Sequence, residues 1–198
     1  MNPARLGLLA FAVTGMATSS LAVAWAPTPP AERSLAAGHP WAEVLPDTGG
    51  AGLIHAVIDI AASPKTVWAV MTDCRMAARL VTSITSCKIT QGGWRQGWDV
   101  RETMTKGNLI VPAIHNIVRD DFQPYSLVRF HKIGGDLAIE EGEWRLEARS
   151  GSVTRLIYVN RVAANINAPA VLVRAGMRGD VSKVLMNIRR ESESVSLK

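Results

Sequence analysis

The sequence predicts an α+β domain in which a curved antiparallel sheet of about six to seven strands wraps around a long C-terminal helix, with two short helices after the first strand. Three observations lead to this prediction. Apolar and polar residues alternate along most of residues 54–162, which is the period of a half-buried strand. Glycine-rich turns separate the alternating segments, as in an antiparallel meander. After residue 169, apolar residues recur at steps of three and four, as in a helix with one buried face.

The composition is that of one ordinary globular domain. The chain has 198 residues, of which 47% are hydrophobic and 20% are charged, so we expect a sizeable core and exclude wholesale disorder. The formal net charge of +5 is a mild excess of Lys and Arg. No concentrated basic face with interleaved aromatic residues is visible in the sequence, so nucleic acid is not an expected partner. The mild positive charge is compatible with contact to an anionic lipid surface.

Residues 1–26 are typical of a signal peptide. No charged residue lies between Arg5 and Glu32, and the interval is rich in Leu, Ala and Val and contains Phe11. It ends in the triplets Ala22-Val23-Ala24 and Ala24-Trp25-Ala26, whose small residues suit a signal peptidase. We therefore expect cleavage near Ala24 or Ala26 and export to the periplasm or cell envelope. A retained membrane anchor is the alternative, because about 20 apolar residues can span a bilayer.

Residues 27–51 are predicted to form a Pro/Gly-rich tether. Five prolines and three glycines fall in this stretch, and such a composition favours an extended chain over a helix. The folded domain is expected over residues 52–193, followed by a short tail, 194–198.

The domain is expected to begin with a strand over residues 54–60, where the even-numbered positions are apolar. Ser63 and Pro64 then mark the start of a helix, because Ser is a good N-cap and Pro suits the first helical turn. This helix is expected to run to about Thr72. A second short helix is expected at about 76–81.

The middle of the chain is expected to form the meander. Its strands are predicted over residues 87–90, 94–104, 109–118, 126–133, 137–148 and 153–162. Pro112 indicates an edge or a bulge, because proline cannot donate to a strand ladder. Residues 120–125 are predicted to form a loop. The segment 109–114 is a candidate rim that moves to admit a ligand.

The C-terminal helix is expected to cover about 20 residues with one apolar stripe. Gly176 and Gly179 each lower its helical propensity by about 1 kcal/mol relative to Ala. The concave face of the sheet is the large apolar surface available to bury the stripe. The stripe consists of Val173, Met177, Val181, Val184, Leu185 and Ile188.

The element order and several local motifs resemble the START-like superfamily, also called SRPBCC, over residues 52–193. The matching motifs are Ile58–Trp68 with its Ser-Pro step, the following Thr72-Asp73 turn, Gly142–Leu146, and Pro169 before the last helix. The superfamily includes the polyketide cyclase/dehydrase group and the coenzyme Q-binding proteins. The resemblance implies a helix-grip fold with a cavity between sheet and helix. Members use it for sterols, phospholipids, quinones, plant hormones or polyketide intermediates, and the fold alone does not select among these.

Cys74 and Cys87 are expected to form a disulfide if the chain is exported, because paired cysteines become oxidised outside the cytoplasm. Two separate buried thiols are the alternative. The resemblance favours the disulfide, since exported members carry cysteines near the second helix and second strand. No His, Asp or Glu cluster joins these cysteines at zinc-like spacing, so we expect no metal and no cofactor.

The sequence has no clear catalytic constellation. It lacks a nucleophile elbow, a phosphate loop and a dinucleotide fingerprint. His115 and Glu102 are weak catalytic candidates, because their strand phases place them among apolar neighbours. The alternatives are a core histidine for His115 and, for Glu102, a solvated outer face on which charges pair across strands. That charged set comprises Arg101, Glu102, Arg129, Glu143, Arg145, Arg155 and Arg161.

Aromatic side chains on the predicted strands favour a binding pocket for a flat or long apolar molecule. The candidate ligand-binding residues are Trp98, Val100, Met104, Val111, His115, Phe130, Trp144, Tyr158, Val173 and Met177. We therefore expect an exported carrier for a quinone, sterol or fatty-acyl ligand, whose basic C-terminal helix touches anionic membrane transiently. A cyclase/dehydrase-type enzyme using the same cavity, and a purely structural domain, are the alternatives. The sequence leaves the oligomeric state open.

Overall fold

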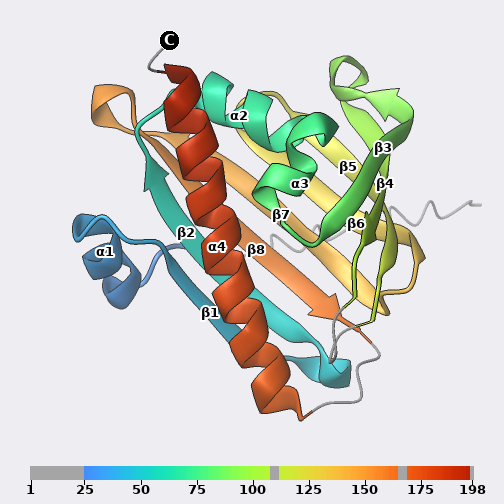
Figure 1. Cartoon of the computed structure of the whole chain (residues 1–198). Coiled ribbons are helices and arrows are strands. Elements are labelled where there is room, and N and C mark those ends of the chain that lie inside the picture. Colours follow the sequence, from blue (N-terminus) through green and yellow to red (C-terminus); the bar gives the residue numbers. More distant parts are fainter. Residues whose placement is uncertain (1–24, 108–111, 165–168, 197–198) are drawn as a thin grey trace, which may run out of the picture.

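The structure, a computed structural model, describes residues 25–107, 112–164 and 169–196 (Figure 1). One antiparallel sheet of eight strands, in the order β1-β2-β8-β7-β6-β5-β4-β3, forms its framework. This confirms the predicted α+β helix-grip architecture, with slightly more strands than expected. The strands are β1 (Trp41–Pro46), β2 (Gly52–Ile60), β3 (Ile84–Gly93), β4 (Trp98–Thr105), β5 (His115–Gln123), β6 (Leu127–Gly135), β7 (Ile139–Ala148) and β8 (Thr154–Ala163).

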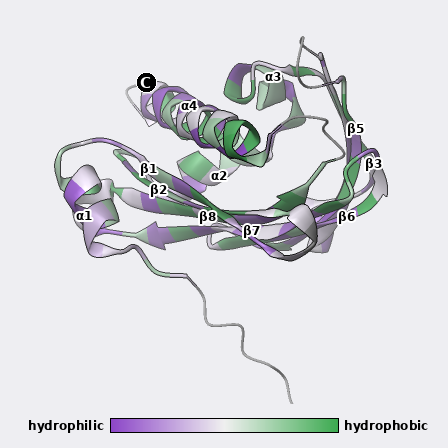
Figure 2. Cartoon of the chain, turned by 90° about the horizontal axis from the view of Figure 1, so that it is seen from below, coloured by the Kyte–Doolittle hydropathy of each residue, from purple (hydrophilic) through white to green (hydrophobic). Residues whose placement is uncertain are grey.

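The sheet curves, and of the four α-helices that the structure describes, α2 (Pro64–Thr72), α3 (Ala77–Leu80) and α4 (Ala170–Ser196) lie on its concave side (Figure 2). The main core lies between them and the sheet, and its fully buried members include Ile58, Leu156 and Leu185. Four short 3-10 helices complete the described chain: η1 (Thr48–Gly50), η2 (Cys74–Met76), η3 (Trp94–Gln96) and η4 (Ser150–Ser152).

The start of α2 follows from its local sequence. The Ser63 hydroxyl accepts a hydrogen bond from the Thr66 backbone N–H at 3.2 Å, and Pro64 occupies the first turn, where no N–H is needed. At the other end, the Thr72 hydroxyl donates to the Trp68 carbonyl at 2.7 Å. The predicted bounds of this helix are confirmed.

The predicted apolar stripe of α4 is also confirmed. Leu185 and Ile188 are buried, and Val181 and Val184 pack at the margin of the same core. The helix is longer than expected and continues to Ser196, so part of the predicted tail is helical. No helix in the described part of the chain is long and apolar enough to cross a membrane. The predicted signal segment lies almost wholly outside the described residues.

The prediction of an extended tether over residues 27–51 is wrong. This stretch contains the helix α1 (Pro29–Ala36) and the strand β1, which pairs with β2. The prolines do not prevent this, because two of them stand at the start of α1 and Pro46 ends an edge strand. Ala31 and Leu35 of α1 pack against Val57 and Ile157 on the convex face.

The strand β5 begins and ends later in the chain than predicted. The expected strand 109–118 and loop 120–125 are replaced by a strand from His115 to Gln123, while residues 108–111 lie outside the described residues. Adjacent aspartates suggested a loop. In the structure they alternate across the sheet instead, with Asp120 buried on the concave side and Asp121 paired with Arg119 on the convex side.

Candidate functional site

A cavity of about 230 Å³, partly open to solvent, lies between the concave face of the sheet and the end of α2; it is called the interior cavity because it lies on the inner side of the sheet. Its walls come from five consecutive strands of the sheet, β4 to β8, and from the last turn of α2. The lining residues are Met71, Thr72, Arg101, Thr103, Asn116, Val118, Asp120, Val128, Phe130, Glu140, Trp144 and Tyr158.

One wall of the interior cavity is aromatic. The ring centroids of Trp144 and Tyr158 are 3.9 Å apart with an interplanar angle of 23°, and the ring of Phe130 lies 6.1 Å from that of Tyr158. The sheet register explains this grouping, because Trp144 pairs with Tyr158 across β7 and β8 and all three residues point to the same face. The wall offers a flat apolar surface against which a ligand can stack.

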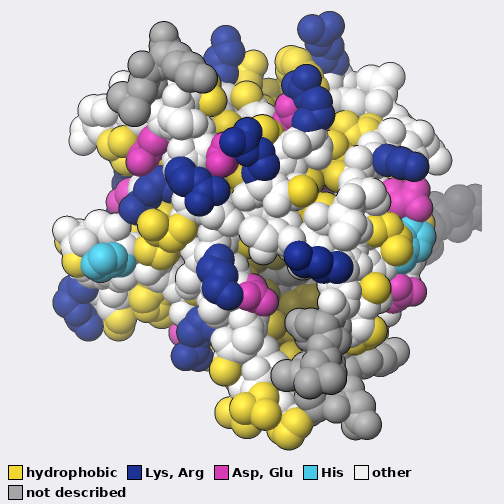
Figure 3. All heavy atoms as spheres, in the orientation of Figure 1, with side chains coloured by type: hydrophobic (Ala, Val, Ile, Leu, Met, Phe, Trp, Pro, Cys, Tyr) yellow, Lys and Arg dark blue, Asp and Glu magenta, His cyan; other side chains and the backbone are white. Residues whose placement is uncertain are grey.

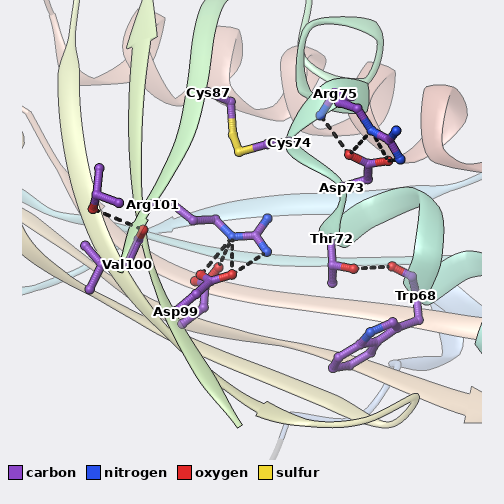
Figure 4. A network of polar contacts seen from close by, with 11 residues as sticks. Trp68, Thr72, Asp73, Cys74, Arg75, Cys87, Asp99, Val100 and Arg101 are labelled. Atoms are coloured by element: carbon purple, nitrogen blue, oxygen red, sulfur yellow. Dashed lines mark hydrogen bonds and ion pairs between the residues drawn. A yellow bond between two sulfur atoms is a disulfide. The ribbon is translucent and has the colours of Figure 1, made fainter. Parts of the chain in front are cut away.

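The part of the cavity wall formed by β4 and β5 carries a buried charge cluster. Arg101 Nε lies 3.0 Å from Asp99 Oδ1 and 2.8 Å from Asp120 Oδ2. Figure 4 shows the guanidinium group of Arg101 beside Asp99, on the side of β4 that faces the end of α2. The exposed fractions of Asp99 and Asp120 are 0% and 7%. Burial raises the pKa of Asp120 to about 7, although Arg101 opposes the rise.

A second polar group extends this wall. The Asn116 side-chain amide donates to Glu140, and the Asn116 carbonyl oxygen Oδ1 is buried without a hydrogen-bond partner. Burial raises the pKa of Glu140 despite the hydrogen bond from Asn116. The Tyr158 hydroxyl accepts from Asn160 Nδ2 at 2.7 Å, and burial raises the pKa of Tyr158 as well. The interior cavity therefore has an aromatic wall and a polar end rich in carboxyl and carbonyl oxygens.

Thr72, which lines the interior cavity, also lines an outer hollow of about 620 Å³. Trp68 forms part of its floor, and partly exposed apolar side chains form its rim. Its other lining residues are Lys65, Ala69, Asp73, Cys74, Arg75, Ile89, Trp94 and Tyr125. This hollow is a candidate entrance for an apolar molecule.

Cys74 in η2 and Cys87 in β3 lie at disulfide distance beside the outer hollow, with their Cα atoms 5.3 Å apart (Figure 4). Asp73 caps the start of η2. Its carboxylate accepts hydrogen bonds from the Arg75 backbone N–H at 2.9 Å and from the Arg75 guanidinium group. Hydrogen bonds from Arg75 lower the pKa of Asp73. No cluster of His, Cys, Asp and Glu in the described chain has the geometry of a metal site.

The structure brings three of the predicted ligand-binding residues into the interior cavity, namely Phe130, Trp144 and Tyr158. Two others, Val173 and Met177, line a separate hollow of about 90 Å³ near the start of α4. Val111 lies outside the described residues. The ligand-binding role of all these residues stays a prediction.

The predicted inward orientation of β4 is wrong. Asp99, Arg101 and Thr103 face the concave side, so the residues between them face the convex side. The residues thereby removed from the interior cavity are Trp98, Val100, Glu102 and Met104. Trp98 packs under Arg119, whose guanidinium carbon is 4.4 Å from the ring centroid. The alternation of β4 predicts the opposite orientation, because the side of this strand that faces the cavity carries buried charged residues instead of apolar ones.

The predicted inward position of His115 is wrong for the same reason. His115 pairs with Met104, and its Nε2 atom lies 2.7 Å from Glu102 Oε1 on the convex face. Sequence reasoning also missed Asp120, Asn116 and Glu140. The alternation Val118, Asp120, Phe122 was the available signal for Asp120, but the adjacent Asp121 obscured it.

Fold and cavity together define a START-like protein of the helix-grip class. Residues 60–189 match the family described as polyketide cyclase/dehydrase and lipid transport, and the chain belongs to this family. The resemblance noted in the sequence is thereby confirmed. No curated protein sequence matches the chain significantly.

Several solved structures share the fold. A START superfamily protein from Mycobacterium smegmatis has 12% identity and a TM-score of 0.63, covering 72% of this chain and 98% of that one. A STAR-related lipid transfer protein from Xanthomonas axonopodis has 9% identity and a TM-score of 0.61, with coverages of 77% and 98%. The Zhui aromatase/cyclase from Streptomyces sp. R1128 has 16% identity and a TM-score of 0.59, with coverages of 72% and 94%. At these identities the likeness concerns the fold.

Proposed function

We propose that the protein is an exported carrier that holds a hydrophobic, lipid-like molecule in the interior cavity and shields it from water. The observation that carries this proposal is the pairing of an aromatic wall with a small buried polar end in one cavity. An apolar body can stack on Trp144 and Tyr158, while one polar group meets Asp120, Asn116 and Glu140. The outer hollow at Thr72 supplies a route of entry.

Several observations support a carrier over an enzyme. The two catalytic candidates, His115 and Glu102, pair with each other on the convex face, away from the interior cavity. Export also separates the protein from polyketide assembly, which uses carrier-bound intermediates in the cytoplasm. The similar solved structures include a lipid transfer protein and an aromatase/cyclase, so fold alone supports both readings.

A cyclase/dehydrase-type enzyme is the second candidate, because one observation favours it. Asp120 lines the interior cavity with a pKa of about 7, so its carboxyl group can take up and release a proton near neutral pH. An enzyme that used this group would lose turnover in Asp120→Asn while it still bound its ligand.

Export is proposed from the N-terminal sequence, and Trp25 favours cleavage after Ala24. The Trp25 ring stacks on His55, with centroids 4.8 Å apart, and on Trp41 at 5.9 Å. Its carbonyl oxygen accepts a hydrogen bond from Arg145. Cleavage after Ala26 would remove these contacts, whereas cleavage after Ala24 keeps them.

Transient contact with an anionic membrane is proposed through α4. Figure 3 shows Lys and Arg side chains gathered over the face of the molecule that carries α4. The first turn of the helix contains Val171 and Leu172, whose exposed fractions are 64% and 63%, and Arg174 and Arg178 follow within two turns. Exposed apolar residues beside cations suit the interface of an anionic bilayer.

The carrier is tested by native mass spectrometry after incubation with a bacterial lipid extract. We expect the folded protein to retain an apolar molecule and Trp144→Ala to lose it. Trp98→Ala is the matched control, because this tryptophan lies on the convex face and its removal leaves the interior cavity unchanged. A protein that retains nothing from any extract, or two tryptophan variants that behave alike, would contradict the proposal.

A further inference from the structure

We propose that the ligand group buried at the polar end of the interior cavity is a hydrogen-bond donor without negative charge, an ammonium or a hydroxyl group. The protein would then select apolar amines and alcohols over carboxylates and phosphates. This inference rests on the proposed carrier function and specifies its ligand class. It follows from the charges and the hydrogen-bonding atoms that line the interior cavity.

The charge balance of the polar end excludes an anion. Among the described residues that line the interior cavity, Arg101 is the one cation, whereas Asp120 and Glu140 are both carboxylic acids. Arg101 is already engaged, since its Nε and Nη2 atoms contact Asp99 and its Nε atom also contacts Asp120. A ligand carboxylate would have to displace one of these aspartates from Arg101, and it would lie beside buried acidic groups that disfavour negative charge.

The hydrogen-bonding atoms of the polar end point to a donor. The side-chain amide of Asn116 donates a hydrogen bond to Glu140. Its oxygen Oδ1 is buried and has no hydrogen-bond partner. Leaving a buried acceptor unpaired costs about 1–3 kcal/mol, so a ligand that satisfies it gains affinity. The carboxyl oxygens of Glu140 and Asp120 add further acceptors. Tyr158 receives a hydrogen bond from Asn160 and keeps its own O–H to donate, which a hydroxyl ligand can also accept.

An ammonium group is the best match for this set. It offers three donors, and its positive charge complements the carboxyl groups of Asp120 and Glu140. A hydroxyl group satisfies Asn116 Oδ1 but leaves the acidic groups without a counter-charge. We therefore expect affinity to fall from amine to alcohol, then to a ketone, which only accepts, and finally to a carboxylate.

Four probes with the same chain length test this order: octylamine, 1-octanol, 2-octanone and octanoate. Each competes with N-phenyl-1-naphthylamine, an uncharged fluorescent apolar molecule, at pH 7.5. We expect octylamine to displace the dye at concentrations about tenfold or more below those that octanoate needs, which corresponds to one hydrogen bond to a charged group. The wild-type protein alone gives this result, so it does not depend on a variant that folds.

Glu140→Gln supplies the second arm. It keeps the shape of the side chain and removes its charge, so we expect octylamine to lose most of its advantage over 1-octanol. Glu141→Gln is the matched control, because Glu141 is the next residue on β7, is exposed, and contacts Arg161 at 3.2 Å on the convex face. This variant should bind all four probes as the wild type does.

The outcomes separate the two proposals. Failure of the dye to bind would contradict the carrier function itself. Dye that binds and is displaced by octanoate or 2-octanone as readily as by octylamine would leave the carrier intact and overturn the donor assignment. Equal effects of Glu140→Gln and Glu141→Gln would overturn it as well, since the advantage of the amine would then not come from the interior cavity.

Discussion

Asp120 is the residue of the interior cavity whose pKa is raised to about 7 in the fold. Two buried aspartates share the single guanidinium group of Arg101, so the cluster holds one carboxyl group more than it can neutralise. Glu140 on β7 and Asp121, the next residue on β5, add further negative charge in the vicinity. Burial is the largest cause of the raised pKa of Asp120, and these neighbours add to it while Arg101 opposes it. The surplus acidic group remains partly protonated near neutral pH.

A pH-dependent stability follows from this shift. The pKa of Asp120 rises from its ordinary value of 3.8 to about 7 in the folded protein, so the folded state binds this proton more tightly than the unfolded state. The contribution of Asp120 is therefore fully present below about pH 4 and is lost as the pH rises to about 7. The loss is on the order of 4 kcal/mol in the free energy of unfolding, because the pKa differs by about 3 between the two states.

Urea denaturation between pH 4 and pH 8 measures this loss. We expect Asp120→Asn to flatten the profile, and to be at least as stable as the wild type at pH 8, because Arg101 and Asp99 then form a balanced pair. Asp121→Asn is the control, since Asp121 lies on the convex face against Arg119. Parallel profiles for the wild type and Asp120→Asn would show that Asp120 keeps an ordinary pKa.

Gly142 is required by the close packing of the cavity wall. A Cβ atom at this position would collide with the Val159 carbonyl oxygen and lie 2.8 Å from Phe130 Cζ. We expect Gly142→Ala to lower the free energy of unfolding by about 1–3 kcal/mol, as other overpacked sites do. Gly93→Ala is the control, because a Cβ atom at Gly93 would have no neighbouring atom within 4 Å. Thermal unfolding of the two variants tests this prediction. A Gly142→Ala variant that melts at the wild-type temperature would contradict the close packing at this position.

At the scale of elements, the N-terminal segment is part of the fold and not a tether. Helix α1 buries Ala31 and Leu35 on the convex face of the sheet. Its Glu32 forms an ion pair with Arg155. Asp59 holds the same guanidinium group through Nε at 2.8 Å, so β2, β8 and α1 meet at one arginine. The hydrogen bonds that Arg155 donates to Asp59 and Glu32 raise its pKa, although burial opposes this.

The contribution of the N-terminal segment to the free energy of unfolding can be measured through the aromatic stack of Trp25. A protein that begins at Pro27 lacks the two aromatic contacts of Trp25, each worth about 0.5–1.5 kcal/mol. We expect it to be less stable in urea by about 1–2 kcal/mol than a protein that begins at Trp25. Trp94→Ala in the longer form is a control for the loss of a partly exposed tryptophan. Equal midpoints for the two N-termini would remove the reason for preferring cleavage after Ala24.

Elements with a strong period or a specific start signal could be predicted from the sequence. The Ser63-Pro64 step gave the start of α2, and the repeat through Leu185 and Ile188 gave the buried face of α4. The orientation of β4 could not be predicted, because the usual rule places apolar residues inward and this strand turns Asp99 and Arg101 inward. Those charges are tolerated there because they pair with each other and with a residue of the neighbouring strand, which the local sequence does not reveal.

The candidate site was predictable in part for the same reason. Phe130, Trp144 and Tyr158 lie on strands whose inner faces follow the ordinary apolar pattern, and all three reach the interior cavity. The polar end depends on register between distant strands. Asn116 meets Glu140 only because β5, β6 and β7 are aligned in the sheet, and no local motif encodes that alignment.

At the scale of the whole molecule, the Cys74–Cys87 pair relates the stability of the fold to the proposed compartment and to the proposed route of ligand entry. It joins η2 to β3 across the segment that contains α3, beside the outer hollow. Closing a loop of about 14 residues restricts the unfolded chain and stabilises the fold by about 3 kcal/mol. An oxidising compartment, as proposed for this protein, would preserve the bond.

Reduction should therefore lower stability and loosen the entrance together. We expect Cys74→Ser with Cys87→Ser to lose about 3 kcal/mol in urea denaturation and to release bound N-phenyl-1-naphthylamine faster, because η2 is then held to β3 only by non-covalent contacts. Trp144→Ala gives the contrasting result, a loss of dye affinity from the wall itself, with the entrance still cross-linked. If the double serine variant were destabilised but released the dye at the wild-type rate, the outer hollow would not be the route that limits exchange. Entry would then have to be sought elsewhere along the rim of the sheet.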